Sequence, residues 1–388
     1  MMQYNVIYAL IWMLALLSLK KTASPSKMIY AFQVALLSLF VGLKFQTGYD
    51  WPIYESHYDA IRSGQEFYLD FEFGYEWLVR ISSFFDLAFE HFSALISIIE
   101  VVFISIVVRS FFPRHCLLVL AVMYSVPDFY LIPTFSLLRQ GLAVSIFLLG
   151  VHKFLSGRQF LAFTLFFIAA SIHYSVLGGV LLLLLIHWFP LSRTTFLIVF
   201  VASVGLYLSS LDVIRAAVEV LIVYVNPKYM IYLDRDVFNA SFAYRAAYVL
   251  VSIVIFSSIY MAWDNVGVQN NTNQLARPIL YRLAFVGLLI PLIIFGFPTL
   301  STRYQYFFAV FLIGVAMNIL LRLNYTSRLV AVFVMAIVAY LPFYRFLSSP
   351  LSIVYIPYQS QLFYDMHNST GQERTNNLLN QLDELWSK

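Results

Sequence analysis

Long apolar runs alternate with short polar segments along almost the whole chain. A helix that crosses a bilayer needs about 20 mostly apolar residues. The pattern predicts twelve such helices, at about 4–19, 28–44, 91–109, 116–133, 137–155, 160–173, 174–190, 195–211, 244–263, 279–297, 304–321 and 329–347. Only the segment 171–175 separates the sixth run from the seventh. We interpret it as a tight helical hairpin; one bent helix is the alternative and would reverse everything downstream.

This pattern predicts an all-α, polytopic membrane protein with about 12 transmembrane helices. The composition agrees, because 61% of the residues are hydrophobic and only 11% are charged, whereas soluble domains are about a quarter charged. The sequence shows no internal repeat, so we expect one integral membrane domain over residues 1–388. The net charge of +4 is too small for a nucleic-acid-binding surface. The single cysteine, Cys116, excludes an intramolecular disulfide and any multi-cysteine metal site.

The distribution of positive charge predicts the orientation of the helices. Half of the 24 Lys and Arg residues fall in six short loops, which together are much shorter than the segments on the other side. Such loops usually face the cytoplasm, so we expect the amino terminus outside. Three longer outside segments then follow, at about 45–90, 212–243 and 348–388. The apolar stretch 213–225 predicts an interfacial or re-entrant helix, and the leucines of 378–386 predict a surface-lying amphipathic helix.

Four polar motifs interrupt the apolar pattern, and all four fall on the expected outside. They are Gly48-Tyr49-Asp50-Trp51, Leu138-Arg139-Gln140-Gly141, Ile172-His173-Tyr174-Ser175 and Ser301-Thr302-Arg303-Tyr304. Titratable groups at membrane depth are costly and usually mark a functional site. A turn with an interfacial aromatic belt would explain much of the first motif, and Arg139 could merely extend to the interface. A shared side nevertheless predicts one pocket.

The residue types in these motifs and in the first long segment predict sugar and phosphate chemistry. Several arginines facing one cavity suit a diphosphate, because guanidinium binds phosphate in fork geometry; these are Arg139, Arg303 and Arg245. A general base could be His173, Asp50, Glu72 or Glu76, and the sequence does not choose among them. Side chains suited to binding sugar rings or hydroxyls are Tyr49, Trp51, Gln140, Tyr174 and Tyr304.

A metal or other cofactor is not expected. Asp234-Arg235-Asp236 is a spaced carboxylate pair, a pattern that holds divalent metals in many sugar-transferring enzymes, but it is short and the interposed arginine weakens it. The sequence has no glycine-rich phosphate loop, serine-nucleophile motif or zinc motif.

Taken together, the motifs resemble the EpsG/Wzy group of bacterial polysaccharide polymerases. In that group a Gly-x-Asp-aromatic element follows the second helix, a Glu-containing aromatic segment comes next, an Arg-Gln-Gly element opens a helix, and a His-Tyr-Ser element follows. The corresponding segments here are 48–51, 71–77, 138–143 and 173–175. Order and spacing match across about residues 40–180, and the second half is similar only in hydropathy and in Arg303. The segment after Glu72 lacks the proline that is often found there.

The resemblance implies a GT-C-like glycosyltransferase in the bacterial cytoplasmic (inner) membrane, with its active face periplasmic or extracellular. Such enzymes transfer a glycan from undecaprenyl diphosphate onto the next lipid-linked repeat unit, so undecaprenyl-diphosphate-linked oligosaccharide is both donor and acceptor. The expected product is O-antigen or exopolysaccharide. Membrane lipid and a chain-length-regulating co-polymerase are the expected partners. Two alternatives stay open: an O-antigen ligase, and a polytopic transporter or flippase for lipid-linked glycan.

Overall fold

The computed structural model describes residues 1–19, 25–189, 192–217, 241–263, 276–364 and 369–386. Within these ranges every regular element is a helix, and Lys44 and Ser360 form an isolated β-bridge. The predicted all-α class is therefore confirmed. The interfacial or re-entrant helix predicted at 213–225 lies mostly outside the described residues, as does Asp234-Arg235-Asp236.

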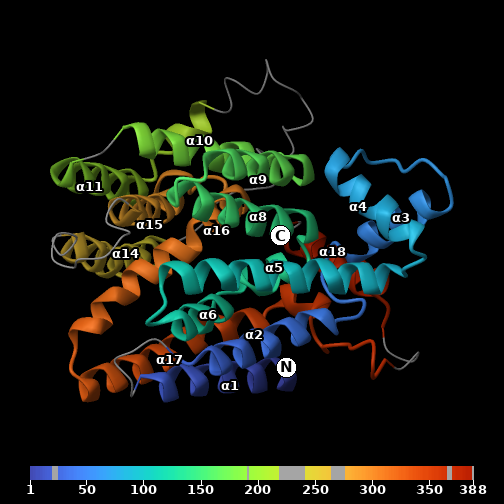
Figure 1. Ribbon diagram of the computed structural model, residues 1–388, viewed down its shortest axis with the longest axis horizontal. Helices are drawn as coiled ribbons and strands as arrows, with labels where there is room; N and C mark the ends of the chain where they lie inside the picture. Colours follow the sequence, from blue (N-terminus) through green and yellow to red (C-terminus); the bar gives the residue numbers. More distant parts are fainter. Residues whose placement is uncertain (20–24, 190–191, 218–240, 264–275, 365–368, 387–388) are drawn as a thin grey trace. The chain divides into compact units, whose positions relative to one another are not determined.

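The contacts divide the chain into two compact units. Unit 1 combines Met1–Leu177 with Leu323–Lys388, and unit 2 is Gly178–Arg322. The helices of unit 1 come from both ends of the sequence (Figure 1): α1 (Met2–Ser18), α2 (Lys27–Gly42), α3 (Trp51–Arg62), α4 (Phe73–Phe84), α5 (Phe89–Phe111), α6 (Cys116–Ser125), η1 (Pro127–Phe129), α7 (Leu131–Phe135), α8 (Leu138–Leu155), α9 (Gln159–Ile172), α17 (Tyr325–Leu347), η5 (Pro350–Val354) and α18 (Gly371–Trp386).

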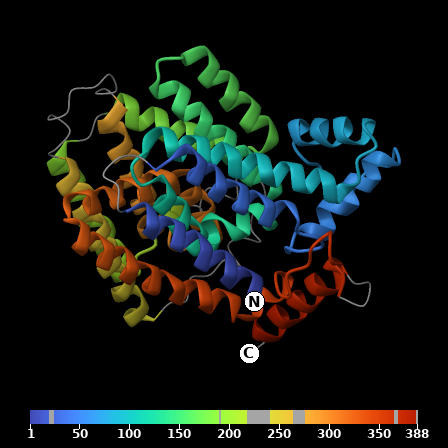
Figure 2. The same ribbon diagram turned by 60° about the horizontal axis from the view of Figure 1, so that its bottom comes forward.

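The centre of unit 1 is built around α8. This helix packs against both α5 and α9, and α5 in turn packs against α2. In α8, 72% of the most apolar window is buried, compared with 11% in α17, although both helices are long and apolar. Figure 2 shows α17 beside α1 along one side of the unit. The amino end of α8, which carries Arg139, is therefore held by packing on several sides.

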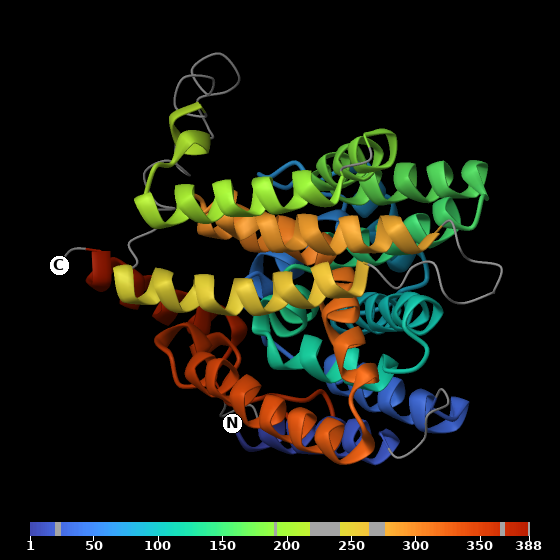
Figure 3. The ribbon, with the colours of Figure 1, turned by 90° about the vertical axis from the view of Figure 1, so that its left-hand side faces the viewer.

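Unit 2 is a smaller group of apolar helices. Its members are α11 (Arg193–Ser209), α14 (Phe242–Trp263), α15 (Ala276–Ile293), α16 (Pro298–Ala316) and η4 (Met317–Arg322), and α10 (Ser175–Trp188) enters it from unit 1. Figure 3 shows α11, α15 and α14 lying side by side, and these three contact one another. The stacked rings of Phe200 and Phe256, with centroids 4.1 Å apart, join α11 to α14.

Helices occur at all twelve predicted positions, but their lengths differ. Among the described residues, five are long and apolar enough to cross a membrane, and the other seven apolar helices have 10–17 residues. The number of transmembrane spans and the GT-C-like fold therefore stay predictions. The run predicted as one helix at 116–133 is broken into α6, η1 and α7. Pro127 explains the break, because proline lacks the N–H that a continuing helix needs.

The outside segments predicted at 45–90 and 348–388 contain ordered elements that meet each other. The first contains α3 and α4, and the second contains η5 and α18, which packs on α3 and η5. Gly48 lies at the junction with φ of +113°, and a β-carbon there would fall 2.8 Å from the Phe135 carbonyl carbon. Only glycine fits this position without strain. The Gly48 amide also donates to the Val354 carbonyl at 2.9 Å, so the carboxyl-terminal segment fixes the start of the loop that leads to the site.

The chain interrupts its helix where the sequence predicted. Helix α9 ends at Ile172, His173 is extended with φ of −154° and ψ of 119°, and α10 begins at Ser175. The break is confirmed, while the hairpin stays a prediction. Because the break leaves His173 and the Tyr174 amide outside regular helix, both can reach a neighbouring segment.

Candidate active site

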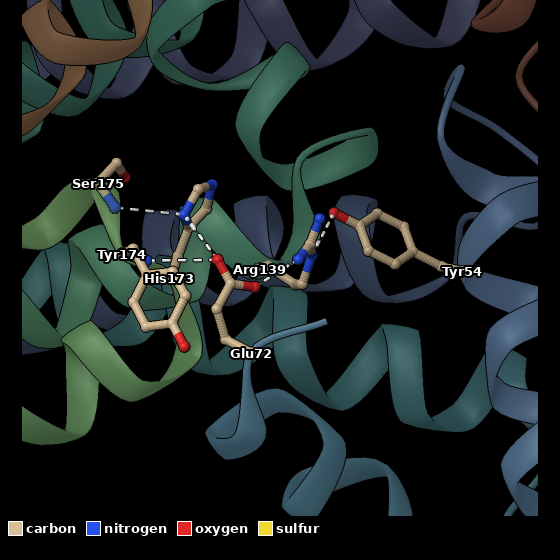
Figure 4. Close-up of polar contacts among 6 residues, drawn as sticks. All are labelled: Tyr54, Glu72, Arg139, His173, Tyr174 and Ser175. Carbon is tan, nitrogen blue, oxygen red and sulfur yellow. Dashed lines mark hydrogen bonds and ion pairs between the residues drawn. The ribbon is translucent and has the colours of Figure 1, made fainter. Parts of the chain in front are cut away.

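A carboxylate from one segment joins an arginine and a histidine from two others within unit 1. Glu72 forms an ion pair with Arg139 through Oε2, and its Oε1 lies 3.3 Å from His173 Nδ1 (Figure 4). The Tyr174 backbone amide also donates to Oε1, at 3.3 Å. Glu72 is only 8% exposed, so both oxygens of a nearly buried carboxylate are engaged. The structure thus brings together three of the predicted site residues, 34 to 101 residues apart in sequence.

The backbone conformation before α4 positions the Glu72 carboxylate to contact both Arg139 and His173. Glu72 is the residue before the first turn of α4, with extended dihedral angles, and its side chain makes no capping bond to the helix. The carboxylate is therefore free to reach across to α8 and to the break after α9. Helix α4 can approach α9 because residue 74 is glycine: a β-carbon there would fall 2.7 Å from the Ser171 carbonyl carbon and oxygen. Gly74 thus sets the distance between Glu72 and His173.

Three aromatic rings lie around the guanidinium of Arg139, and we call them the aromatic enclosure: Tyr54, Phe71 and Tyr75. The guanidinium carbon lies 3.8 Å from the centre of the Phe71 ring, 5.7 Å from that of Tyr54 and 5.9 Å from that of Tyr75. Nε donates to the Tyr54 hydroxyl at 3.4 Å. Rings at these distances stabilise a cation and restrict its movement. With 21% of its side chain exposed, Arg139 is held in place yet remains accessible to an anion.

The contacts of His173 indicate which ring nitrogen carries the proton. Nδ1 lies 3.3 Å from the Glu72 carboxylate and 3.4 Å from the Ser175 amide nitrogen. One nitrogen cannot donate to the first and accept from the second. The contact with the carboxylate is charge-assisted and therefore stronger, so we assign the proton to Nδ1. Nε2 then carries the lone pair, and a carboxylate orients the imidazole, as in serine-hydrolase triads.

The electrostatics of Glu72 distinguish it from an ordinary buried acid. Burial by itself would raise the pKa of the carboxyl, but the hydrogen bond with His173 and the charge of Arg139, together with that of His173 when its imidazole is protonated, outweigh it and lower the pKa to about 2. Glu72 is therefore ionised at neutral pH. A carboxylate of such low basicity is a poor proton acceptor, so its geometry suits orientation of the histidine better than proton abstraction.

A second histidine, His57, packs against two of the rings that surround Arg139. His57 is buried, with its ring 4.3 Å from that of Phe71 and 5.8 Å from that of Tyr75. Desolvation, reinforced by the positive charges of Arg139 and Arg80, lowers the pKa of His57 to about 4. This histidine is therefore neutral at physiological pH and packs as an aromatic ring against the arginine enclosure.

Two other acids were predicted as candidate bases, Asp50 and Glu76. Asp50 precedes α3, and its charge acts on Tyr54, where burial raises the pKa of the phenol and Asp50 raises it further. Asp50 thus lies near a residue that holds Arg139. Glu76, one turn into α4, lies 4.0 Å from Arg80 in an i,i+4 pair. The acid that contacts His173 is Glu72.

The predicted sugar-binding residues of unit 1 differ in exposure. Trp51 is 1% exposed and packs against Phe89, and Gln140 is also buried, so neither has a surface open to a ligand in this structure. Tyr49 anchors the loop through its backbone: its amide donates to the Ser136 hydroxyl, and its carbonyl accepts from Thr375. The Tyr174 ring is 60% exposed beside Glu72 and is the one of these four best placed to stack on a sugar.

The remaining predicted residues belong to unit 2. Arg245 donates to the Tyr207 carbonyl at 3.4 Å and to the Ser210 hydroxyl. Tyr304 and Arg303 lie in the first turns of α16, and the Tyr304 ring stacks on that of Phe307, with centroids 5.9 Å apart. Both arginines are half-buried. They stay predicted diphosphate ligands.

Tyr54 and Phe71 hold Arg139 but were not among the predicted site residues. Aromatic residues make up 18% of the chain, so composition alone does not distinguish these two. A usable signal was their position, since Phe71 directly precedes Glu72 and Tyr54 follows Asp50 by one helical turn. Across the described ranges, no three His, Cys, Asp or Glu side chains gather in a way that could hold a metal ion.

The fold defines a helical membrane protein, with a buried carboxylate that links an arginine to a histidine. The chain belongs to the EpsG family, whose model matches residues 27–360. The resemblance inferred from the motifs is thereby confirmed, and membership suggests a polysaccharide polymerase. No curated protein and no solved structure matches the chain.

Proposed function

We propose that this protein is a glycosyltransferase that polymerises undecaprenyl-diphosphate-linked oligosaccharide repeat units on the outer face of the cytoplasmic membrane. The observation that carries the proposal is the Glu72 carboxylate, which engages His173 and Arg139 at the same time (Figure 4). Transfer from a diphosphate requires a base for the acceptor hydroxyl and a cation for the leaving group. This site supplies both groups, because His173 and Arg139 each contact one oxygen of the Glu72 carboxylate.

In this proposal His173 is the base. With Nδ1 directed at Glu72, Nε2 can take the proton from the acceptor hydroxyl as the new glycosidic bond forms. Glu72 stabilises the positive imidazole that results, as the aspartate does in a serine protease. The pKa of about 2 argues against Glu72 itself as the base. Glu72 is the predicted acid that contacts His173, and Glu76 pairs with Arg80 instead.

Arg139 stabilises the negative charge that builds on the departing diphosphate. Its aromatic enclosure fixes the guanidinium before the substrate arrives, so no reorganisation is needed during the reaction. Arg303 and Arg245 are proposed as further diphosphate ligands. The exposed Tyr174 ring is proposed to stack on a sugar of the acceptor or donor. No metal ion is needed in this scheme, because arginine supplies the positive charge.

A test compares two glutamates in neighbouring positions. Glu72→Gln removes the charge that orients His173, whereas Glu76→Gln changes the same side chain one helical turn away, where it pairs with Arg80. Each variant is produced in cells that lack the wild-type gene, and the surface glycan is separated by length. We expect Glu72→Gln to leave single repeat units and Glu76→Gln to give a normal ladder.

Three results would overturn the proposal. A normal ladder from Glu72→Gln, at wild-type protein level, would remove the carboxylate from the reaction. Full-length polymer that accumulates on the lipid carrier, without transfer to its final acceptor, would indicate a ligase. Loss of repeat units from the outer face altogether would indicate a flippase.

A further inference from the structure

Helix α4 has two opposite faces of different character. One face packs into unit 1 through Tyr75, Val79 and Ser82. The other is apolar yet exposed, and its residues follow one another at intervals of three or four: Phe73, Trp77, Ile81 and Phe84. This spacing places all four on one side of the helix. We call these four residues the α4 stripe.

The α4 stripe is too exposed and too aromatic for an ordinary water-facing surface. Trp77 is 62% exposed and Phe84 is 84% exposed, and Phe85, just after the helix, is also open. A soluble surface rarely carries so many large apolar side chains together. Arg80 and Glu76 flank the stripe as an ion pair. Tryptophan and phenylalanine on one face, with a charged edge, are typical of helices that lie in a membrane interface.

The stripe continues onto an exposed face of the apolar helix α9. Helix α4 contacts α9 in unit 1 (Figure 1), and the Phe73 ring lies 6.5 Å from that of Phe167. Helix α9 is apolar throughout and exposes Phe160, Phe163 and Phe167 at helical spacing. An exposed apolar face on such a helix is directed at lipid. The α4 stripe therefore extends a lipid-facing surface beyond the end of α9.

We infer that the α4 stripe is a membrane-docking surface, seated among the lipid acyl chains of the leaflet next to Glu72. The acidic side chain that precedes α4 is then held at the level of the lipid headgroups. This consequence rests on the proposed function: a diphosphate linked to a lipid presents itself at that level. Docking of α4 would thus keep Glu72, Arg139 and His173 where the donor's diphosphate lies. The depth of the stripe can be measured without substrate.

A spin-label experiment measures this depth. The single cysteine, Cys116, is buried and is replaced by alanine. Trp77→Cys and Phe84→Cys then place a nitroxide on the stripe, and Glu66→Cys places one on the exposed loop before α4. The full-length protein is reconstituted in vesicles of phosphatidylethanolamine and phosphatidylglycerol. Power saturation compares collisions with oxygen, which concentrates in the bilayer, and with a water-soluble nickel complex.

We expect the ratio of oxygen to nickel collisions at positions 77 and 84 to exceed that at position 66 several-fold. Two probe positions keep the test valid if one variant fails to fold, which size-exclusion chromatography detects. Equal ratios at all three positions would overturn the inference. Protection from both reagents at 77 and 84 would also overturn it, because it would mean that protein covers the stripe. Neither result would affect the proposed roles of Glu72 and His173, which the length ladder tests separately.

Discussion

Arg139 in unit 1 and Arg245 in unit 2 were predicted for the same task, but their surroundings differ. Arg139 pairs with the Glu72 carboxylate and lies against three aromatic rings. Arg245 donates to a carbonyl and a hydroxyl, both of them neutral. The carboxylate and the rings fix the geometry of Arg139 and partly offset its charge, whereas the neutral oxygens around Arg245 leave its charge without an offset from these contacts. We infer that Arg139 is fixed in place to stabilise the charge on the departing diphosphate and that Arg245 mainly adds attraction for the anion.

Substitutions of Arg139 should have the largest effect. Arg139→Ala removes a prepositioned cation from the site, and the loss of one such donor typically costs about 100- to 1,000-fold in rate. Arg139→Lys should recover little, because an ammonium cannot bind the carboxylate and stack on Phe71 at once. Polymer formation from purified lipid-linked substrate would be measured. A lysine variant with near wild-type rate would show that charge alone is sufficient at this position.

Gly74→Ala should have the next largest effect. The added methyl group would overlap the Ser171 carbonyl and push α4 from α9, and a displacement of ~1 Å at a reacting group can cost about 100-fold. Gly205→Ala, where nothing lies within 4 Å, is the matched control. Rates and thermal stability of both variants would be compared with the wild type. Equal activity of the two variants would mean that Gly74 does not set the position of Glu72.

Substitution of Arg245 should reduce activity less than substitution of Arg139, and it should change a different kinetic parameter. Because its contacts are to neutral oxygens, Arg245→Lys should keep most of the activity and Arg245→Ala should lose about tenfold, the equivalent of ~1.4 kcal/mol. The loss should fall on apparent donor affinity more than on the maximal rate. If Arg245→Lys is as inactive as Arg139→Lys, the two arginines do not differ in the way their surroundings indicate.

The smallest predicted effect is that of the Glu72 charge on the stability of the folded protein at acid pH. In the folded protein the pKa of Glu72 is lowered to about 2, below the value near 4.3 of an unfolded chain. A lowered pKa stabilises the folded state above the unfolded value, and this stabilisation is lost as pH falls from about 5 to about 2. The melting temperature of the wild type should therefore fall toward that of Glu72→Gln over this range. A constant difference between the two would contradict ionic pairing of Glu72.

The sequence predicted the individual polar residues better than their associations. Glu72, Arg139 and His173 were identifiable because each interrupts an apolar or aromatic segment. Their convergence depends on the packing of α4 against α9, which hydropathy does not encode. The role of Gly74 was hidden for the same reason, since only the Ser171 backbone beside it makes glycine necessary.

The sequence likewise predicted where the long apolar helices lie better than where helices break. The long apolar runs became helices, but the break at Pro127 was overlooked because hydropathy stays high across it. Helix α4 was not predicted, because it is too short to span a bilayer and large apolar side chains occur on both its buried and its exposed face. Trp51 stays a predicted sugar contact, and in the structure it is buried against Phe89. An aromatic residue in a loop can serve either role, and tertiary contacts decide between them.

The central claim is that Glu72 and His173 act as one unit, and a double-mutant cycle tests it most directly. Polymerisation rates would be measured for Glu72→Gln, His173→Gln and the double variant, each purified and reconstituted in the same vesicles. If Glu72 acts only by orienting His173, the double variant should be no slower than the slower single variant, because residues that act as a unit are not additive. Losses that multiply in the double variant would show that the two residues act independently and would contradict this account.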